Sequence, residues 1–253
     1  MTVATIQLPG PGAIAQDLVR LPSESSGGIA TDPVAAEAAV VGYLERLFAA
    51  AGFPGERIPV RDRRECLVVR WPRPGAPRLL LCGHLDTVSG QGMAEPFAGT
   101  MHDGMLWGRG ACDDKGPVAA AIHAWLALAA AGRQPQFDLT FLGTAEEEIT
   151  FAGARAARNV IPPCAAILVS EPTALRLVSA HKGVFRCRLS TTGTACHSSR
   201  PELGRNAILA MTEVIAHLER LGAELAQTPD PELGPTTVAV TSIHGGVADN
   251  VIP

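Results

Sequence analysis

The stretch LLLCGHLDT, residues 79–87, joins an apolar run to a His-x-Asp pair and is the strongest indication of the fold. Its apolar start, residues 79–82, predicts a buried strand. His84 and Asp86 follow, and because side chains alternate along an extended chain, both can face one pocket at the carboxyl end of that strand. A core histidine beside a surface aspartate explains the same pair, so the rest of the chain must decide between the two interpretations.

Length, composition and charge bound the class of protein. The 253 residues are 47% hydrophobic and 18% charged, which suits one large domain or two smaller ones. The formal net charge is only -4 and no block of one sign occurs, so no nucleic-acid partner is expected. No membrane partner is expected either, because the longest nearly uncharged stretch, residues 116–132, is short for a membrane span.

Cysteine usage and the start of the chain predict the compartment. Six cysteines occur at irregular spacing without a CxxC pair, which argues against a zinc–thiolate site. The first residues lack a basic segment followed by an apolar one, so no secretory signal is expected. Reduced cysteines in a cytoplasmic protein are the simplest interpretation.

Strand-like and helix-like segments alternate through residues 1–179, which we expect to form the first domain. Helices are expected at residues 33–51, 117–131 and 152–158. Strands are expected at residues 57–60, 66–71, 78–82, 137–143 and 164–169. This alternation predicts an α/β fold with a mostly parallel sheet flanked by helices.

The pattern changes near residue 180. Residues 184–190 alternate apolar and basic side chains, as an antiparallel strand with one exposed face does. A helix is expected at about residues 206–221 and a further strand at residues 236–243. Residues 180–253 are therefore expected to form a second, smaller domain.

Acidic residues or histidine recur where the expected strands of the first domain stop. These residues, together with one aspartate at the entrance to a helix, are His84, Asp86, Asp113, Glu147, Glu148 and Glu171. Because the carboxyl ends of parallel strands share one edge of a sheet, the side chains can meet in one cleft. Gathered carboxylates repel one another, and a divalent cation relieves that repulsion. Carboxylate and imidazole ligands together suit zinc, cobalt or manganese.

More acids gather here than one ion needs, which favours two metals bridged by one carboxylate. Such a pair polarises a substrate carbonyl and lowers the pKa of a bound water. A carboxylate that does not bind metal can then accept the proton of that water. At a strand end, one of the adjacent Glu147 and Glu148 can be a ligand while the other acts as the base.

Each acid also has a purely structural explanation. Asp113 or Asp114 could cap the helix that begins near Lys115. Residues 146–148 could form a solvated turn, and Glu171 could lie in a surface loop. All of these explanations must hold together for the site to be absent, and the recurrence of acids at strand ends favours the site.

Four motifs in these segments resemble those of a known family. They are GHLDTV at residues 83–88, GRGACDDKG at 108–116, TAEEE at 144–148 and SEPT at 170–173. In this order they resemble the metal-binding motifs of the M20 metallopeptidase family, which includes acetylornithine deacetylase, succinyl-diaminopimelate desuccinylase, aminoacylases and carboxypeptidases. HKG at residues 181–183 and GTACHSSRP at 193–201 resemble the start of the lid or dimerisation domain, in its deacetylase and desuccinylase form.

The resemblance implies a zinc-peptidase-like fold with a partial α+β lid, and a two-metal zinc site in which cobalt or manganese could substitute. His84 and Glu171 would bind the first metal, Asp113 would bridge both metals, and Glu148 would bind the second. Glu147 would be the general base; a register shifted by one residue would give this role to Glu146. The same resemblance implies that Asp86 orients His84.

Two further residues receive roles from the lid motifs. In the family, a histidine at the position of His197 reaches across a dimer interface to stabilise the oxyanion of the intermediate. Asn250 matches an asparagine that contacts substrate. Each could instead be a solvated loop or turn residue. The resemblance thus implies a homodimer formed through the lid, acting on a small N-acyl amino acid or a short peptide.

The family pattern continues beyond residue 253, so a C-terminally truncated member is expected. The absent part carries the last histidine ligand of the second metal and an arginine that binds substrate. The expected function is hydrolysis of the amide bond of an N-acylated amino acid by a metal-activated water. The alternatives are a dipeptidase or carboxypeptidase, and an inactive remnant that lacks the last metal ligand.

Overall fold

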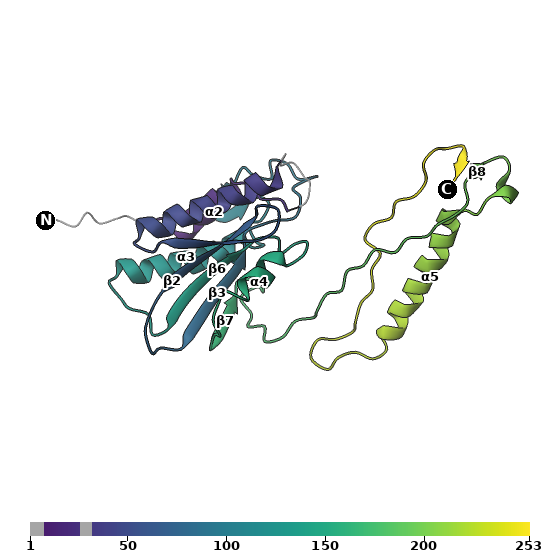
Figure 1. Ribbon diagram of the computed structural model, residues 1–253. Helices are drawn as coiled ribbons and strands as arrows, with labels where there is room; N and C mark the ends of the chain where they lie inside the picture. The colour runs from purple at the N-terminus through teal and green to yellow at the C-terminus, as the bar shows by residue number, and fades with distance from the viewer. Residues whose placement is uncertain (1–7, 26–31) are drawn as a thin grey trace. The chain divides into compact units, whose positions relative to one another are not determined.

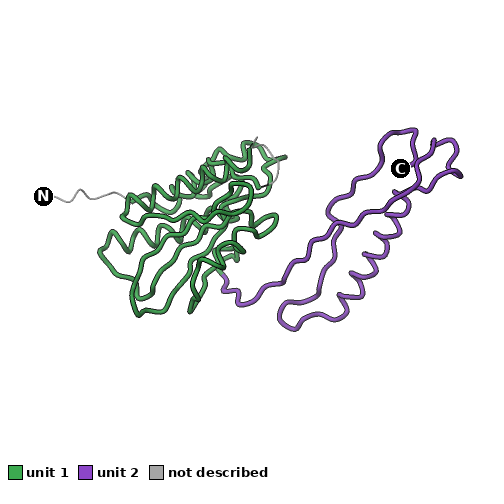
Figure 2. Tube along the Cα trace, viewed as in Figure 1, with its two compact units in different colours: residues 1–175 green, residues 176–253 purple. Residues whose placement is uncertain are grey.

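The computed structural model describes residues 8–25 and 32–253, and the chain divides into two compact units, Met1–Leu175 and Arg176–Pro253 (Figure 2). In the first unit the helices are α1 (Pro11–Val19), α2 (Pro33–Ala50), α3 (Lys115–Ala130) and α4 (Ala152–Ala157). Its strands are β1 (Gly55–Pro59), β2 (Glu65–Trp71), β3 (Arg78–His84), β4 (Thr100–His102), β5 (Met105–Trp107), β6 (Asp138–Thr144) and β7 (Ala166–Val169). The α/β class predicted from the sequence is confirmed.

Among the described residues of this unit, the central sheet has five strands in the order β1-β2-β6-β3-β7 (Figure 1). The β3 strand runs parallel to β6 and β7, whereas β1–β2 and β2–β6 are antiparallel pairs. The sheet is therefore mixed, and the parallel arrangement expected from the sequence is confined to β6, β3 and β7. The β1–β2 connection, residues 60–64, is too short for the crossover that parallel strands require.

The central strands are buried on both faces, and each face has its own core. Leu67 and Val69 of β2 pack into a core with α1, α2 and α3, while Cys66 and Val68 pack into a second core with α4. This division follows from the two-residue alternation of side chains along a strand. The carboxyl ends of β3 and β6 are consequently held rigidly between two packed layers.

Two helices that the sequence predicts contribute to these layers. The Asp32 carboxylate accepts hydrogen bonds from the N–H groups of Val34 and Ala35 and so caps α2. The apolar helix α3 buries Trp125 against Phe48 of α2, with ring centroids 5.6 Å apart in an edge-to-face arrangement. Such an aromatic pair adds about 1 kcal/mol to the stabilisation from buried area.

The second unit contains η1 (Pro201–Leu203), α5 (Ala207–Leu225) and an antiparallel pair formed by β8 (Cys196–His197) and β9 (Val251–Ile252). Residues 184–190 and 236–243 were expected to be strands, but neither segment pairs as a strand within the described part of this unit. An alternating pattern predicts which side chains are exposed, whereas a strand also needs a hydrogen-bonded partner. Val238 instead lies against α5. A Cβ added to Gly222 of that helix would be 3.3 Å from the Cβ of Val238.

None of the described helices is both long enough and apolar enough to cross a bilayer.

Candidate metal centre

The candidate site lies where the parallel strands end. His84 is the last residue of β3 and pairs in register with Thr144, the last residue of β6. Glu147 and Glu148 follow β6 after two intervening residues, and Glu171 follows β7 after one. Parallel pairing therefore brings residues that are far apart in sequence to one edge of the sheet, as the strand-end pattern predicts.

In the described part of the chain, two groups of three side chains could hold a cation. Ligand atoms of His84, Asp113 and Glu171 lie within 4.8 Å of one another, and so do those of His84, Glu147 and Glu148. His84 is buried, Glu147 and Glu148 are half-buried, and Asp113 and Glu171 are exposed. The site is thus fixed at its base and open to solvent on the side of the carboxylates.

His84 is oriented by contacts to both of its ring nitrogens. Its Nδ1 lies 2.9 Å from the backbone carbonyl oxygen of Asp86, and its Nε2 lies 2.8 Å from Oδ1 of Asp113. An Nδ1–H that donates to the Asp86 carbonyl leaves Nε2 as the ligand nitrogen, the usual arrangement of a metal-binding histidine. Although burial lowers the pKa of His84, its hydrogen bonds with Asp86 and Asp113 raise that pKa to about 10.

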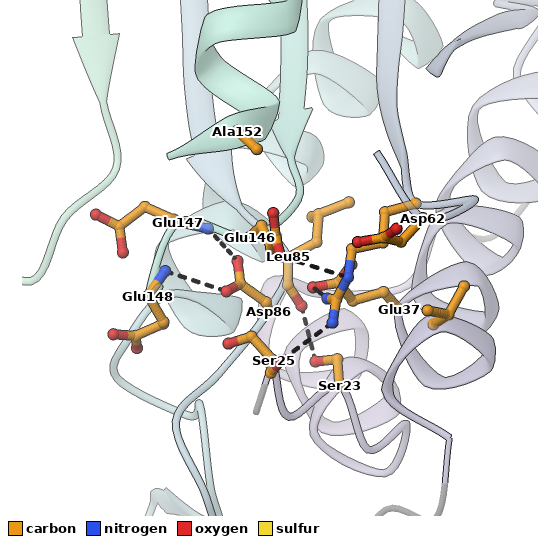
Figure 3. Close-up of polar contacts among 12 residues, drawn as sticks. Ser23, Ser25, Glu37, Asp62, Leu85, Asp86, Glu146, Glu147, Glu148 and Ala152 are labelled. Carbon is orange, nitrogen blue, oxygen red and sulfur yellow. Dashed lines mark hydrogen bonds and ion pairs between the residues drawn. The ribbon is translucent and has the colours of Figure 1, made fainter. Parts of the chain in front are cut away.

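Asp86 supports the next loop as well as the histidine. Its fully buried carboxylate accepts hydrogen bonds from the backbone N–H groups of Glu147 at 3.0 Å and Glu148 at 3.1 Å. In Figure 3 the side chains of both glutamates point away from Asp86. Burial opposes ionisation of Asp86, yet hydrogen bonds from His84 and the Glu147 backbone keep its pKa below the ordinary value.

Glu147 and Glu148 carry the electrostatic signature of crowded carboxylates. Burial raises the pKa of Glu147, the charge of His84 opposes that rise, and the neighbouring Glu148 adds to it. Burial also raises the pKa of Glu148, and the negative charge of Asp113 contributes. A divalent cation would relieve this repulsion, and imidazole with carboxylates is a donor set that suits zinc. The residues present therefore fit the metal centre that the sequence predicts.

Glu146 has a different environment from its two neighbours. Its buried carboxylate accepts hydrogen bonds from Arg61 at 2.8 and 2.6 Å and from the Thr150 hydroxyl at 2.8 Å. The hydrogen bonds from Arg61 hold the pKa of Glu146 below its ordinary value. Glu146 belongs to neither group of candidate ligands, which favours Glu147 over Glu146 as a base.

Asp114 and Ser170 support the site in a way that the sequence did not predict. Asp114 is the N-cap residue of α3, but its side chain makes no capping hydrogen bond there. Its buried Oδ2 instead accepts hydrogen bonds from Ser170 Oγ at 2.7 Å and from the His84 backbone N–H at 3.2 Å. Burial raises the pKa of Asp114 to about 7. Asp114 thereby joins the end of β3 to the residue that precedes Glu171.

Gly83 makes this junction sterically feasible. A Cβ at this position would lie 2.3 Å from Ser170 Oγ and 2.7 Å from Asp114 Oδ2. The glycine directly before the histidine in the GHLDTV motif was the available signal for such a close approach.

His197 and Asn250, the two residues predicted from the lid motifs, lie together in the second unit. His197 pairs with Val251 across β8 and β9, and the backbone N–H of Ser198 donates to the carbonyl oxygen of Asn250 at 2.9 Å. Both side chains are exposed, and Nδ1 of His197 lies 2.8 Å from the hydroxyl of Ser199. One short strand pair therefore presents both residues.

Comparison with known proteins identifies the class. Residues 80–245 match the family described as Peptidase family M20/M25/M40, a range that contains His84, Asp113, Glu148 and Glu171. The chain belongs to this family, which confirms the resemblance seen in the four motifs.

Curated relatives carry two kinds of name. An acetylornithine deacetylase of Proteus mirabilis is 36% identical over 256 residues, which cover 98% of this chain and 65% of the relative. A probable carboxypeptidase of Aspergillus terreus is 36% identical over 211 residues, covering 78% of this chain and 47% of the relative. The chain spans about half to two thirds of the length of these relatives.

Solved structures show the same fold. The M20 family metallo-carboxypeptidase Sso-CP2 of Sulfolobus solfataricus superimposes with a TM-score of 0.63 at 17% identity, over 83% of this chain and 50% of that one. A tripeptidase of Staphylococcus aureus gives a TM-score of 0.59 at 20% identity, over 94% of this chain and 61% of that one.

Proposed function

We propose that this chain provides the metal centre of an amidohydrolase that removes the acyl group from an N-acylated amino acid. The observation that carries the proposal is the convergence of His84 with two pairs of acidic side chains at one sheet edge. A deacetylase or desuccinylase reaction is favoured because relatives over most of the chain bear those names.

In this proposal His84 and Glu171 would hold one divalent metal, Glu148 would hold a second, and Asp113 would be a ligand of both. Zinc is the proposed metal, with cobalt or manganese as substitutes. Bound there, the metals supply Lewis-acid chemistry to the amide carbonyl and to the attacking water.

Glu147 is the proposed general base and acid. Its raised pKa suits a carboxylate that takes a proton from water and passes it to the leaving amine nitrogen. Asp86 fixes the backbone of Glu147 and the ring of His84, so the base and the ligand share one rigid support. Glu146 does not suit this role, because its carboxylate forms an ion pair with Arg61.

The second unit is proposed to serve the same reaction. His197 would stabilise the oxyanion from a partner copy of the chain, and Asn250 would contact the substrate. Their shared position at the β8–β9 pair supports a joint role. A homodimer formed through this unit and a cytoplasmic location are parts of the same proposal; the free cysteines agree with a reducing compartment.

A carboxypeptidase or dipeptidase is the second candidate, because a probable carboxypeptidase matches at the same identity as a deacetylase. The purified chain, supplied with zinc, should be assayed with N-acetylornithine, N-succinyl-diaminopimelate and unblocked dipeptides. Faster hydrolysis of an N-acyl substrate supports the deacylase, and faster hydrolysis of a dipeptide supports the alternative. Zinc binding without hydrolysis of any of them supports the inactive remnant.

A further inference from the structure

The loop that carries Glu147 and Glu148 is anchored by a residue that neither binds metal nor contacts substrate in the proposed mechanism. Glu146 has a φ of 60°, a left-handed conformation that is unfavourable for a residue with a side chain. Its carbonyl oxygen accepts hydrogen bonds from the N–H groups of Thr150 at 3.2 Å and Phe151 at 2.9 Å. A strained residue at the start of a tight turn persists only where its surroundings hold it.

Arg61 supplies that hold from the β1–β2 connection. Its Nε and Nη2 atoms contact the two different carboxylate oxygens of Glu146, at 2.8 and 2.6 Å. Such two-point contact fixes both the position and the plane of a carboxylate, which a single ammonium group does not do. The Arg61 side chain is 53% exposed, whereas that of Glu146 is 3% exposed. A surface arginine therefore pairs with a buried carboxylate beside the candidate site.

Arg64 supports the pair from the interior. It is buried, its Nη1 lies 2.6 Å from the carboxylate of Glu37 on α2, and its Nε lies 3.7 Å from Glu146. Its Nη2 also donates to the backbone carbonyl oxygen of Ser25 at 3.0 Å. Arg64 thus connects the surroundings of Glu146 to α2 through Glu37 and to the chain before α2 through Ser25.

The loop is consequently held from two directions. The Asp86 carboxylate accepts hydrogen bonds from the backbone N–H groups of Glu147 and Glu148. Arg61 donates hydrogen bonds to the side chain of Glu146, immediately before them. Fixing both the peptide plane and the preceding side chain leaves little freedom for the Cα–Cβ bond of Glu147. The directions of the two candidate site carboxylates therefore depend on a contact outside the site.

We propose that Arg61 is a positioning residue of the metal centre, which acts through its two-point contact with Glu146 to aim Glu147 and Glu148. This inference rests on the proposed function, because it assigns the loop to a metal site. It predicts that an exposed arginine, remote in sequence from every motif, controls metal affinity.

The test compares Arg61→Ala and Arg61→Lys with Arg63→Ala in the full chain. Arg63 is exposed on the same turn and provides the matched control. Each protein is titrated with cobalt(II) while its visible absorption spectrum is recorded, and its thermal unfolding is measured without metal. We expect Arg61→Ala to weaken cobalt affinity about tenfold, the lower end of the range for contacts that support ligands, and to shift the visible bands. Arg61→Lys should restore part of the affinity, and Arg63→Ala should match the wild type.

The outcomes separate this inference from the proposed function. Cobalt affinity and spectrum equal to the wild type in Arg61→Ala would overturn the positioning role and leave the proposed function standing. Loss of the folded state in Arg61→Ala, together with a folded Arg61→Lys whose affinity and spectrum equal the wild type, would also overturn it. A wild-type chain that binds neither cobalt nor zinc would overturn the proposed function, and this inference with it.

Discussion

The carboxylate of Asp86 accepts the backbone N–H of Glu147 at 3.0 Å, and this contact connects the end of β3 to the loop after β6. The same aspartate presents its carbonyl oxygen to Nδ1 of His84 at 2.9 Å. One residue therefore sets the orientation of a candidate ligand and of the candidate base. The Asp86 carboxylate itself lies 3.6 Å from Nδ1 of His84. Replacing this side chain should therefore affect both residues, which distinguishes Asp86 from a residue that supports the fold alone.

Asp86→Asn is predicted to lower both stability and metal affinity. An amide has one acceptor oxygen, so one of the two N–H groups would face an NH2 group instead of an acceptor. The expected loss in the free energy of unfolding is about 1–3 kcal/mol, and zinc affinity should fall by about 10- to 100-fold. Urea denaturation and zinc titration measure the two effects. Asp103→Asn, at an exposed turn, is the control that should change neither.

Gly83→Ala is predicted to destabilise the end of β3 beside the site. The new Cβ would meet Ser170 Oγ at 2.3 Å and Val118 Cγ2 at 2.5 Å, so β3 or its neighbours must shift. Overpacking of this kind costs about 1–3 kcal/mol of stability. Gly12→Ala provides the contrast, because a Cβ at this exposed position of α1 meets nothing within 4 Å. Equal melting temperatures for the two variants would contradict this prediction.

The candidate ligands could be predicted from the sequence because their placement depends on local rules. Period-two alternation and the common edge of parallel strands suffice to bring His84 and Glu171 together. The roles of Asp114 and Arg61 could not be predicted in this way. Their contacts join elements that are distant in sequence, as when Arg61 meets Glu146, and the type of residue alone fits a helix cap or a solvated turn equally well.

The two segments of the second unit that were expected to be strands show where prediction from composition fails. Residues 184–190 have the composition of a half-exposed strand, but composition does not supply a partner. The helix of the same unit was predictable because its cap is local. Asn206 accepts the N–H groups of Ile208 and Leu209 at the start of α5, close to the boundary expected from the sequence.

Metal affinity is predicted to rise with pH. His84 has a pKa of about 10 without metal, so at neutral pH a cation must displace a proton from its ring. Well below that pKa, each bound zinc ion releases one proton from His84, and each unit of pH lowers the proton concentration tenfold. Zinc affinity should therefore increase about tenfold per unit between pH 6 and pH 8. Titration calorimetry in buffers of different ionisation enthalpy measures the proton release directly. Affinity that does not change over this range would contradict the assignment of His84 as a ligand.

Glu147→Gln is predicted to separate catalysis from metal binding. The amide cannot accept a proton from water, so the hydrolysis rate should fall by about 10²–10⁴-fold. Zinc affinity should change much less, because Glu147 is proposed to act as the base and Glu148 as the ligand. Glu148→Gln should show the opposite pattern, with weaker zinc binding as its first effect. Parallel zinc titrations and rate measurements on the two variants test this division, and identical behaviour of both would contradict it.

The central claim is that His84 and the acids around it form a metal centre that hydrolyses an acyl amide. The most direct measurement is the zinc content of the purified chain after zinc addition and dialysis, paired with N-acetylornithine hydrolysis, for the wild type and His84→Ala. The account predicts bound zinc and hydrolysis in the wild type, and loss of both in a folded His84→Ala protein. A wild-type chain that retains no zinc, or a His84→Ala chain that retains as much as the wild type, would contradict it.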